Sequence, residues 1–279
     1  MADTKTYIIV DTSYAVFYRF HATKRWYSFA HRDDYNACDN LFIDDVFKTK
    51  YKKLFINMFT PLFKKYNSDF KHVIFAIDCP RSTIWRNDFI DKYKGTRVQK
   101  PGDEAIGDFF KYTYANIIPE LIKTYSSNTI SYDTLEGDDC IHIMKNIIRD
   151  KHSEQPIVII GSDHDLMQLL DNGQEDLTKI ITLKDKSMRD KSCGDSGKDL
   201  EIKILMGDKS DNIPSCFPKC GYKTALKLIN NNELLETKFI KYPNSREVYE
   251  RNKKIISFKH IPRHLYDTCY DAHKDIVTG

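Results

Sequence analysis

The segment Tyr7-Ile8-Ile9-Val10-Asp11 is a short apolar run that stops at an aspartate. Two later segments repeat this pattern: His72-Val73-Ile74-Phe75-Ala76-Ile77 ends at Asp78, and Ile157-Val158-Ile159-Ile160 ends in Gly161-Ser162-Asp163. Continuous apolar runs rich in β-branched residues predict strands that are buried on both faces, as in a parallel sheet. We therefore expect three neighbouring strands, each followed by an acid.

Amphipathic helices are predicted between these strands. Apolar residues recur at helical spacing from Phe47 to Tyr66, and Pro61 inside that pattern should kink or break the helix. A second helix is expected from Gly137 to about Asp150. Alternation of strands and helices predicts an α/β fold with right-handed crossovers and a central, mostly parallel sheet flanked by helices.

The overall composition is that of a packed globular protein. Of 279 residues, 41% are hydrophobic and 30% are charged, which excludes disordered and collagen-like classes. No apolar run approaches the length of a membrane span, the N-terminus does not resemble a signal peptide, and seven scattered cysteines indicate reduced thiols in an intracellular compartment. The net charge of +3 argues against a strongly basic protein, but the distribution of charge, not the sum, determines the field.

Acidic residues gather where the predicted strands end. Asp11, Asp78 and Asp163 should share the carboxyl edge of the sheet, where ligands bind in such folds. Four more acids fall beside them in the sequence: Glu136, Asp138, Asp139 and Asp165. Each acid alone is equally well explained as a turn or helix-cap residue. Together they would repel one another unless cations lie among them, which favours a site for a hard divalent ion such as Mg²⁺.

Other kinds of site have little support in the sequence. Cys216 and Cys220 lack a second ligand pair for zinc, and no G-x-S-x-G elbow indicates a serine hydrolase. Neither G-x-G-x-x-G nor a Walker A motif is present, so a nucleotide cofactor is not predicted.

Several motifs, in order, resemble those of the flap endonucleases and 5′-3′ exonucleases. Val10-Asp11-Thr12-Ser13 with Tyr18-Arg19-Phe20 resembles the opening of that family. Leu135-Glu136-Gly137-Asp138-Asp139 and Gly161-Ser162-Asp163-His164-Asp165-Leu166 resemble its two acidic blocks. Met206-Gly207-Asp208-Lys209-Ser210-Asp211-Asn212-Ile213-Pro214, followed by Lys223-Thr224-Ala225, resembles its G-D-x-S-D-N-I-P signature. The likeness spans residues 7–230.

The resemblance implies a PIN-like 5′ nuclease domain over residues 1–200, with a helical arch at about 81–115. A helix-three-turn-helix subdomain and further helices would follow over residues 201–279. The resemblance also implies two Mg²⁺ ions, with Mn²⁺ as a substitute, and a stand-alone protein of viral or phage-like type. Every acid of the family's metal site has a counterpart: Asp11, Asp78, Glu136, Asp138, Asp139, Asp163, Asp165, Asp208 and Asp211.

Basic residues are concentrated in the predicted arch. Residues 81–100 contain six Lys or Arg and two Asp. From the resemblance, Lys94 and Arg97 are assigned to the scissile phosphate, and Tyr93 to stacking on a base. Arg86 and Arg19 are further DNA-contact candidates. Without the resemblance, this segment would be interpreted as a solvated basic helix.

A second group of DNA contacts is predicted in the loop Ser215–Ala225. This loop is one residue longer than in the family and retains one of its three glycines. The resemblance implies a grip on duplex DNA there, with K⁺ as a further bound ion. Backbone amides at the start of the following helix suit phosphate. The residues assigned to this contact are Lys219, Gly221, Lys223, Thr224 and Lys227.

The leading functional hypothesis is a structure-selective, Mg²⁺-dependent 5′ nuclease. Its expected partner is DNA with a 5′ flap or 5′ end, and RNA–DNA junctions are a further substrate. The protein is expected to be an intracellular monomer without membrane contact. Two alternatives remain: a PIN-type endoribonuclease, which lacks a helix-three-turn-helix block, and a non-catalytic protein that binds branched DNA.

Overall fold

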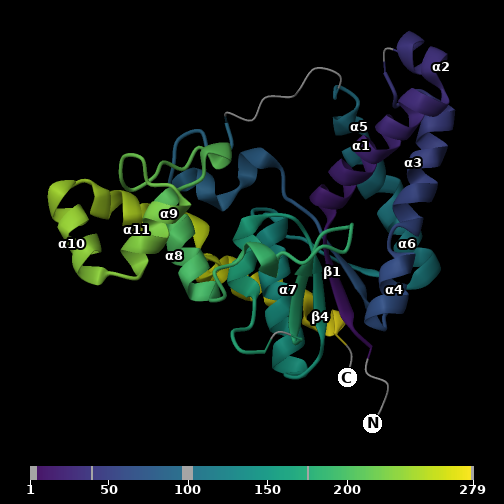
Figure 1. Ribbon diagram of the computed structural model, residues 1–279. Helices are drawn as coiled ribbons and strands as arrows, with labels where there is room; N and C mark the ends of the chain where they lie inside the picture. The colour runs from purple at the N-terminus through teal and green to yellow at the C-terminus, as the bar shows by residue number, and fades with distance from the viewer. Residues whose placement is uncertain (1–4, 39, 96–102, 175, 278–279) are drawn as a thin grey trace.

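A computed structural model describes residues 5–38, 40–95, 103–174 and 176–277 of the chain (Figure 1). Its centre is a five-stranded sheet in the order β3-β2-β1-β4-β5, and every neighbouring pair is parallel. The predicted α/β class is confirmed. The strands are β1 (Tyr7–Asp11), β2 (Val73–Ala76), β3 (Asn128–Ile130), β4 (Ile157–Ile160) and β5 (Thr178–Ile181).

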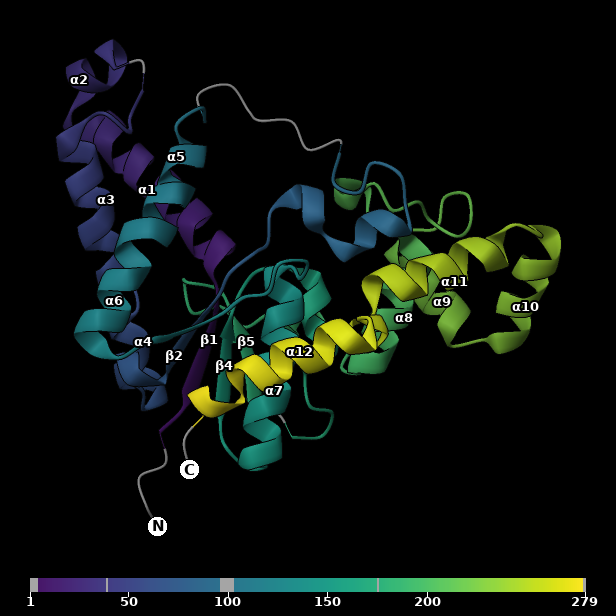
Figure 2. The same ribbon diagram turned by 180° about the vertical axis from the view of Figure 1, so that it is seen from behind.

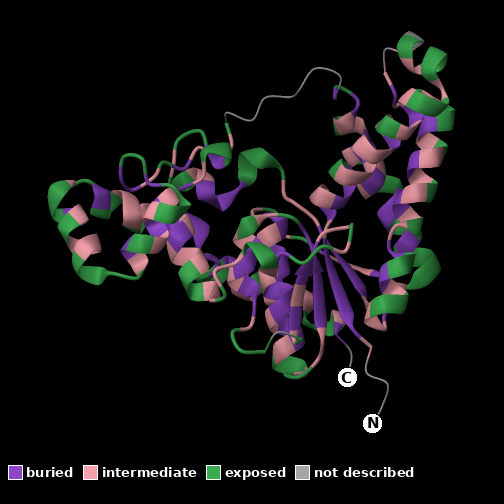
Figure 3. Ribbon diagram, viewed as in Figure 1, coloured by how far each residue is buried: buried purple, intermediate pink, exposed green. Residues whose placement is uncertain are grey.

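Side chains of β1, β2 and β4 alternate between two hydrophobic cores, one on each face of the sheet. In β1, Tyr7 and Ile9 join one core, whereas Ile8 and Val10 join the other. The strands β2 and β4 alternate in the same way. Figure 3 shows these central strands as buried. This double burial explains why the three runs are apolar at every position instead of at every second one.

Helices cover both faces of the sheet (Figure 2). One face is covered by a group rich in aromatic residues: α1 (Thr12–Ala30), α3 (Asp45–Asn57), α4 (Thr60–Tyr66), α5 (Ile106–Tyr112) and α6 (Ile118–Tyr125), with α2 (Arg32–Ala37) beyond them. The opposite face is covered by α7 (Gly137–Lys151), and α12 (Arg263–His273) packs on α7. The predicted break at Pro61 is confirmed, since α3 ends and α4 begins just before it.

A second group of helices lies beside the sheet and has its own core. It comprises α8 (Ser196–Met206), α9 (Tyr222–Ile229), α10 (Asn232–Lys241) and α11 (Ser245–Ile256). The side-chain amide of Asn252 on α11 donates to Ile204 O (3.0 Å) and Pro214 O (2.8 Å). These bonds hold α11 against α8 and against the loop that leads to α9. The chain then returns to the sheet domain through α12.

The segment Arg81–Gly95 joins the two groups of helices. It forms short 3₁₀ turns, η2 (Arg81–Thr83) and η3 (Trp85–Asp88), and not the solvated basic helix that would be expected without the family resemblance. Ile84 and Tyr93 pack with isoleucines of α8 and α11 in a small shared core. No helix in the described part of the chain is long and apolar enough to cross a membrane.

Candidate active site

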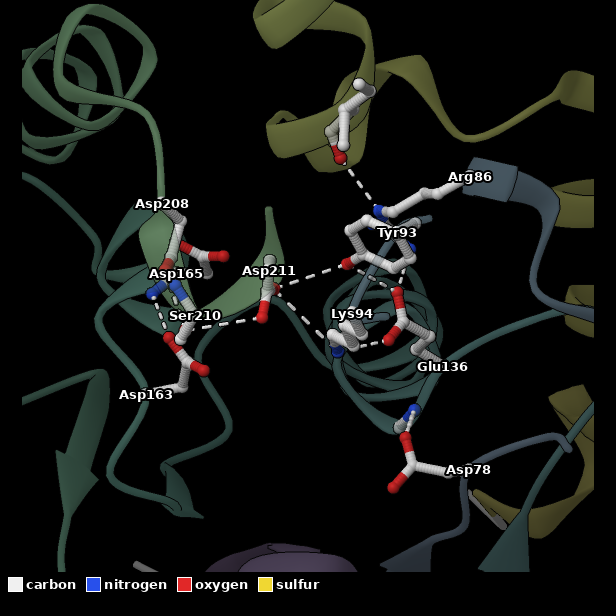
Figure 4. Close-up of polar contacts among 12 residues, drawn as sticks. Asp78, Arg86, Tyr93, Lys94, Glu136, Asp163, Asp165, Asp208, Ser210 and Asp211 are labelled. Atoms are coloured by element: carbon white, nitrogen blue, oxygen red, sulfur yellow. Dashed lines mark hydrogen bonds and ion pairs between the residues drawn. The ribbon is translucent and has the colours of Figure 1, made fainter. Parts of the chain in front are cut away.

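Carboxylates from separate elements meet at the carboxyl edge of the sheet (Figure 4). Asp11 is the last residue of β1, Asp78 lies two residues after β2, and Asp163 three after β4. Glu136 and Asp138 are brought to the same edge by the N-terminus of α7. The predicted convergence of acids therefore occurs.

Several of these acids are also helix caps. Asp11 Oδ1 accepts from the backbone N–H of Tyr14 at 2.9 Å, and Asp163 Oδ1 accepts from that of Asp165 at 2.9 Å. Asp208 Oδ1 accepts from the backbone N–H of Ser210 at 2.7 Å. Each of these cap bonds uses one carboxylate oxygen. The two interpretations of the acids, cap and metal ligand, are thus compatible.

The carboxylates nearest β1 repel one another. Burial, and then the charge of Asp78, raises the pKa of Asp11 to about 7, although the N–H of Tyr14 opposes this shift. Burial, followed by Asp163 and Asp11, raises the pKa of Asp138 well above its ordinary value. Such shifts indicate negative charge that the protein itself leaves uncompensated.

Lys203 of α8 partly neutralises a neighbouring pair of acids. Its Nζ lies 3.0 Å from Asp165 Oδ1 and 2.5 Å from Asp208 Oδ2. Burial, then Asp163, raises the pKa of Asp165 to about 7 even so. Burial alone would raise the pKa of Asp208 as well, but hydrogen bonds from Lys203 and Ser210 lower it to about 2.

Glu136 and Asp211 are held by residues of the segment Arg81–Gly95. The Nζ of Lys94 pairs with Glu136 Oε1 and lies 3.9 Å from Asp211 Oδ2. The hydroxyl of Tyr93 donates its single hydrogen to Glu136 Oε2 at 3.0 Å and lies 3.4 Å from Asp211 Oδ2. The side chain of Tyr93 is buried, with 6% of the residue exposed. This differs from the predicted stacking role, because the ring offers no free face to a base.

Asp139 and Arg86 form a buried ion pair. Arg86 donates to both oxygens of Asp139, at 2.7 and 2.6 Å, and its Nε donates to Ile255 O of α11 at 2.7 Å. The Nε1 of Trp85 donates to the same carboxylate at 3.0 Å. Asp139 is 0% exposed and Arg86 4% exposed. Their predicted roles as metal ligand and DNA contact are therefore not supported: the pair fastens α7 to α11.

Two basic DNA-contact candidates remain, Arg19 and Arg97. Arg19 lies on α1 with its guanidinium 5.5 Å from the ring of Tyr18, and burial lowers its pKa. The Nε of Arg19 is buried without a hydrogen-bond partner among the described residues. Arg97 falls outside the residues that the structure describes.

A cleft of about 1410 Å³ leads away from the carboxylates. Asp11 and Asp163 line one part of it, and Lys219, Gly221 and Tyr222, at the start of α9, line another. The exposed Lys223 and Lys227 and the partly buried Thr224 lie on α9 itself. One continuous hollow thus connects the acids with the predicted DNA-gripping loop.

The turn between α8 and α9 depends on unusual backbone conformations. Gly207 has φ +65°, and a Cβ there would come within 2.5 Å of Ile213 O. Asn212 and Lys219 adopt left-handed conformations, with φ of 63° and 54°. The close pairing of Asp208 with Ile213, through backbone bonds of 2.9 and 2.7 Å, requires glycine at position 207.

The donor set at the sheet edge suits a hard divalent cation. Among residues 5–38, 40–95, 103–174 and 176–277, no three His, Cys, Asp or Glu side chains are arranged to chelate one ion. All the converging ligands are nevertheless carboxylates, and burial and mutual repulsion raise the pKa of Asp11 and of Asp138. Mg²⁺ needs few protein ligands, because it retains several waters. The residues present therefore fit such an ion.

Sequence reasoning missed three residues of this site. Lys203 is one lysine among many in the C-terminal part, and only the fold shows that it lies between Asp165 and Asp208. Ser13 donates a hydrogen bond to Asp78, and the hydroxyl of Tyr114 lies 2.9 Å from Ser13 Oγ. The position of Ser13 two residues after Asp11 was a usable signal, but nothing in the sequence pointed to Tyr114.

Residues 6–195 match the family described as "5'-3' exonuclease, N-terminal resolvase-like domain". The chain is 30% identical over 203 residues to a 5′-3′ exonuclease of Buchnera aphidicola, covering 71% of this chain and 66% of that protein. It is also 30% identical over 164 residues to DNA polymerase I of Bacillus caldotenax, which covers 57% of this chain and only 17% of the polymerase. The chain thus spans under two thirds of these relatives.

Solved structures with the same fold include a protein of bacteriophage T5 co-crystallised with metal ions. That structure has a TM-score of 0.68 at 18% identity, over 98% of this chain and 99% of that one. The flap endonuclease of bacteriophage T5, solved as a pseudo-enzyme-product complex with DNA and metal ions, has the same TM-score, identity and coverage. Since the family match runs from β1 to the residue before α8 and includes the acids at the sheet edge, the chain belongs to the 5′-3′ exonuclease family.

Proposed function

We propose that this chain is a metal-dependent 5′ nuclease that hydrolyses phosphodiester bonds at 5′ ends and flaps of DNA, with RNA–DNA junctions as a further substrate. One observation carries the proposal: Asp11 and Asp163, from the neighbouring parallel strands β1 and β4, line a cleft that continues to the start of α9, and Asp78 follows β2 at the same edge of the sheet. Family membership supports the same activity.

Two divalent ions are part of the proposal, Mg²⁺ with Mn²⁺ as a substitute. Asp11, Asp78, Asp138 and Asp163 are the acids best placed to hold one ion, because no lysine or arginine pairs directly with them among the described ion pairs. Asp165, Asp208 and Asp211 would serve the other, once Lys203 and Lys94 beside them move, and Glu136 would contribute the oxygen that Lys94 now occupies, because Arg86 also pairs with this carboxylate, at 2.9 Å. Bound ions would supply Lewis-acid activation of water and stabilisation of the leaving oxygen.

The residues of the chain itself position the DNA. Lys94, now on Glu136 and Asp211, is proposed to turn to the scissile phosphate, and Arg97 is assigned to the same phosphate. The backbone N–H groups of the first turn of α9, where the N-cap Gly221 supplies no side-chain cap, suit the phosphates of a duplex together with Lys219 and Lys223. The loop Ser215–Gly221 is the proposed K⁺ site. Such contacts to phosphate are independent of sequence and weaken as the salt concentration rises.

Three further features belong to the proposal. The protein acts as a monomer in an intracellular compartment, as expected for an enzyme that acts on DNA. The third feature is a stand-alone protein of viral or phage-like type, which the motifs of the sequence suggested.

The proposal is tested by incubating the protein with 5′-flap DNA, blunt duplex, single-stranded DNA and RNA, each in Mg²⁺ or in EDTA. We expect Mg²⁺-dependent cleavage of the flap and of duplex 5′ ends. Cleavage of RNA alone would favour an endoribonuclease. Tight binding of the flap by folded protein without any cleavage would instead identify a non-catalytic DNA-binding protein.

A further inference from the structure

A π-helical turn interrupts the helix that returns from the predicted arch to the sheet. This turn, Thr113–Ile117, lies between α5 and α6. Pro119, in the first turn of α6, has no N–H and cannot continue the α-helical ladder. The N–H of Ile118 bonds to Thr113 O, five residues back. The extra residue is visible in the buried positions, which run Phe109, Thr113 and Ile117 and then shift by one to Ile118 and Leu121.

The π turn brings a tyrosine hydroxyl to the edge of the carboxylate cluster. The hydroxyl of Tyr114 lies 2.9 Å from Ser13 Oγ, although the two residues are 101 positions apart. Ser13, in the first turn of α1, hydrogen-bonds to Asp78 Oδ2. A chain of hydrogen bonds therefore runs from the returning helix, through α1, to an acid that follows β2.

The direction of these hydrogen bonds follows from the groups involved. An ionised carboxylate only accepts, so the single hydroxyl hydrogen of Ser13 is donated to Asp78. Ser13 Oγ can then only accept from Tyr114, which makes the tyrosine the donor. Hydrogen bonds in series strengthen one another, so the Tyr114 hydroxyl strengthens the bond that Ser13 makes to Asp78.

The second oxygen of Asp78 is fixed from the other side. Asp78 Oδ1 accepts from the backbone N–H of Gly137 at 2.6 Å. A Cβ at position 137 would lie 3.2 Å from that oxygen, so glycine allows this close approach. With one donor on each oxygen, the plane of the carboxylate is set, and each oxygen keeps a lone pair for a cation.

We propose that Tyr114 is a positioning residue: through Ser13 it orients Asp78 and thereby sets the affinity of the site for its divalent ion. The proposal rests on the proposed function, since it concerns the same carboxylates. Outer partners of metal ligands commonly change metal affinity by roughly 10–100-fold when they are removed. The π turn places the Tyr114 hydroxyl within hydrogen-bond distance of Ser13 Oγ.

The test compares Tyr114→Phe with Tyr112→Phe, which removes one phenolic oxygen two residues earlier, at the last residue of α5. Mn²⁺ binding is measured by calorimetry without DNA, and thermal unfolding is measured in EDTA. We expect Tyr114→Phe to bind Mn²⁺ roughly tenfold more weakly at an unchanged melting temperature, and Tyr112→Phe to match the wild type. Wild-type Mn²⁺ affinity in Tyr114→Phe would overturn the proposal.

Variants of Ser13 test whether the two hydroxyls act in series. Ser13→Ala should weaken Mn²⁺ binding at least as much as Tyr114→Phe, and Ser13→Thr, which keeps the hydroxyl, should restore it. Adding Tyr114→Phe to Ser13→Ala should cause no further loss, whereas additive losses would contradict a single chain. These measurements are independent of cleavage: wild-type protein that binds Mn²⁺ but cleaves no DNA would refute the proposed function and leave the role of Tyr114 standing.

Discussion

At the scale of single residues, the role of each acid depends on whether a basic side chain of the protein pairs with it. Asp139 is covered by Arg86 and Trp85, and its pKa is lowered by Arg86 despite complete burial, which alone would raise it. Asp138, the preceding residue, has no such partner within the described part of the chain, and burial and neighbouring acids raise its pKa. Adjacent residues of one sequence motif thus have different tasks, one structural and one suited to a metal.

The Arg86–Asp139 pair gives a direct test of this distinction. Arg86→Met should lower the free energy of unfolding by about 3–5 kcal/mol, because it leaves a buried carboxylate without its partner. Replacing both residues, as in Arg86→Met with Asp139→Leu, should recover much of the loss. Urea denaturation measures both variants. If Arg86→Met were as stable as the wild type but bound DNA weakly, Arg86 would be the DNA contact that the sequence predicts.

At the scale of elements, the turn from α8 to α9 contains two glycines in different surroundings. One has a backbone conformation and close neighbours that exclude a side chain, and the other has open space around it. At Gly207, φ is +65° and a Cβ would meet Ile213 O and Pro214 at 2.5 Å. At Gly221, the N-cap of α9, a Cβ would meet no atom within 4 Å. Gly207 is therefore required by the packing of the fold itself, whereas Gly221 lines the cleft and leaves room there for a ligand.

Alanine at each glycine separates these reasons. Gly207→Ala should lower the free energy of unfolding by more than about 1 kcal/mol, because both its conformation and the space oppose a side chain. Gly221→Ala should fold with near wild-type stability and weaken DNA binding, because its methyl group would meet a phosphate that approaches the helix start. A free energy of unfolding for Gly207→Ala equal to that of the wild type would show that the turn tolerates a side chain at position 207.

Helix α7 contains a histidine that makes stability depend on pH. Burial lowers the pKa of His142 to about 4, against the opposing charge of Asp139, and Lys145 and Lys259 add to the lowering. The ring stacks on Phe258 at 5.4 Å. Since the unfolded histidine titrates near 6.5, its contribution is complete above that pH and is lost as the pH falls from 6.5 to 4.

His142→Gln should therefore flatten the pH dependence of stability in this window. The wild type should lose up to roughly 3 kcal/mol more than the variant between pH 7 and pH 4. Urea denaturation at a series of pH values measures the difference, and common losses from carboxylates cancel in the comparison. Parallel curves for the two proteins would mean that His142 is protonated in the folded state as readily as in the unfolded one.

At the scale of the whole molecule, much of the architecture was predictable because it depends on local patterns. Apolar runs ending at Asp11, Asp78 and Asp163 predicted the central strands and the edge where their acids meet. Pairings between distant positions were not predictable, because no local pattern encodes them. Arg86 bonds to Ile255 O across 169 positions, and Tyr114 meets Ser13 across 101. Such pairings determine which of the predicted site residues remain accessible to a metal ion or to DNA.

The near-neutral net charge of +3 conceals two separate regions of opposite charge. Acids are concentrated at one sheet edge, and lysines lie beside them and along the cleft toward α9. Such an arrangement presents negative charge to cations and positive charge to a phosphate backbone within one hollow. Under the proposed function, the carboxylates would carry out cleavage and the cleft would bind DNA.

This separation is tested most directly with Asp163→Asn, by measuring Mg²⁺-dependent cleavage of a 5′-flap DNA and the affinity for the same DNA in parallel. We predict that the wild type cleaves in Mg²⁺ and not in EDTA, and that Asp163→Asn loses cleavage while its DNA affinity stays close to that of the wild type. Loss of DNA binding together with cleavage, or cleavage that persists in the variant, would contradict the assignment of the carboxylates.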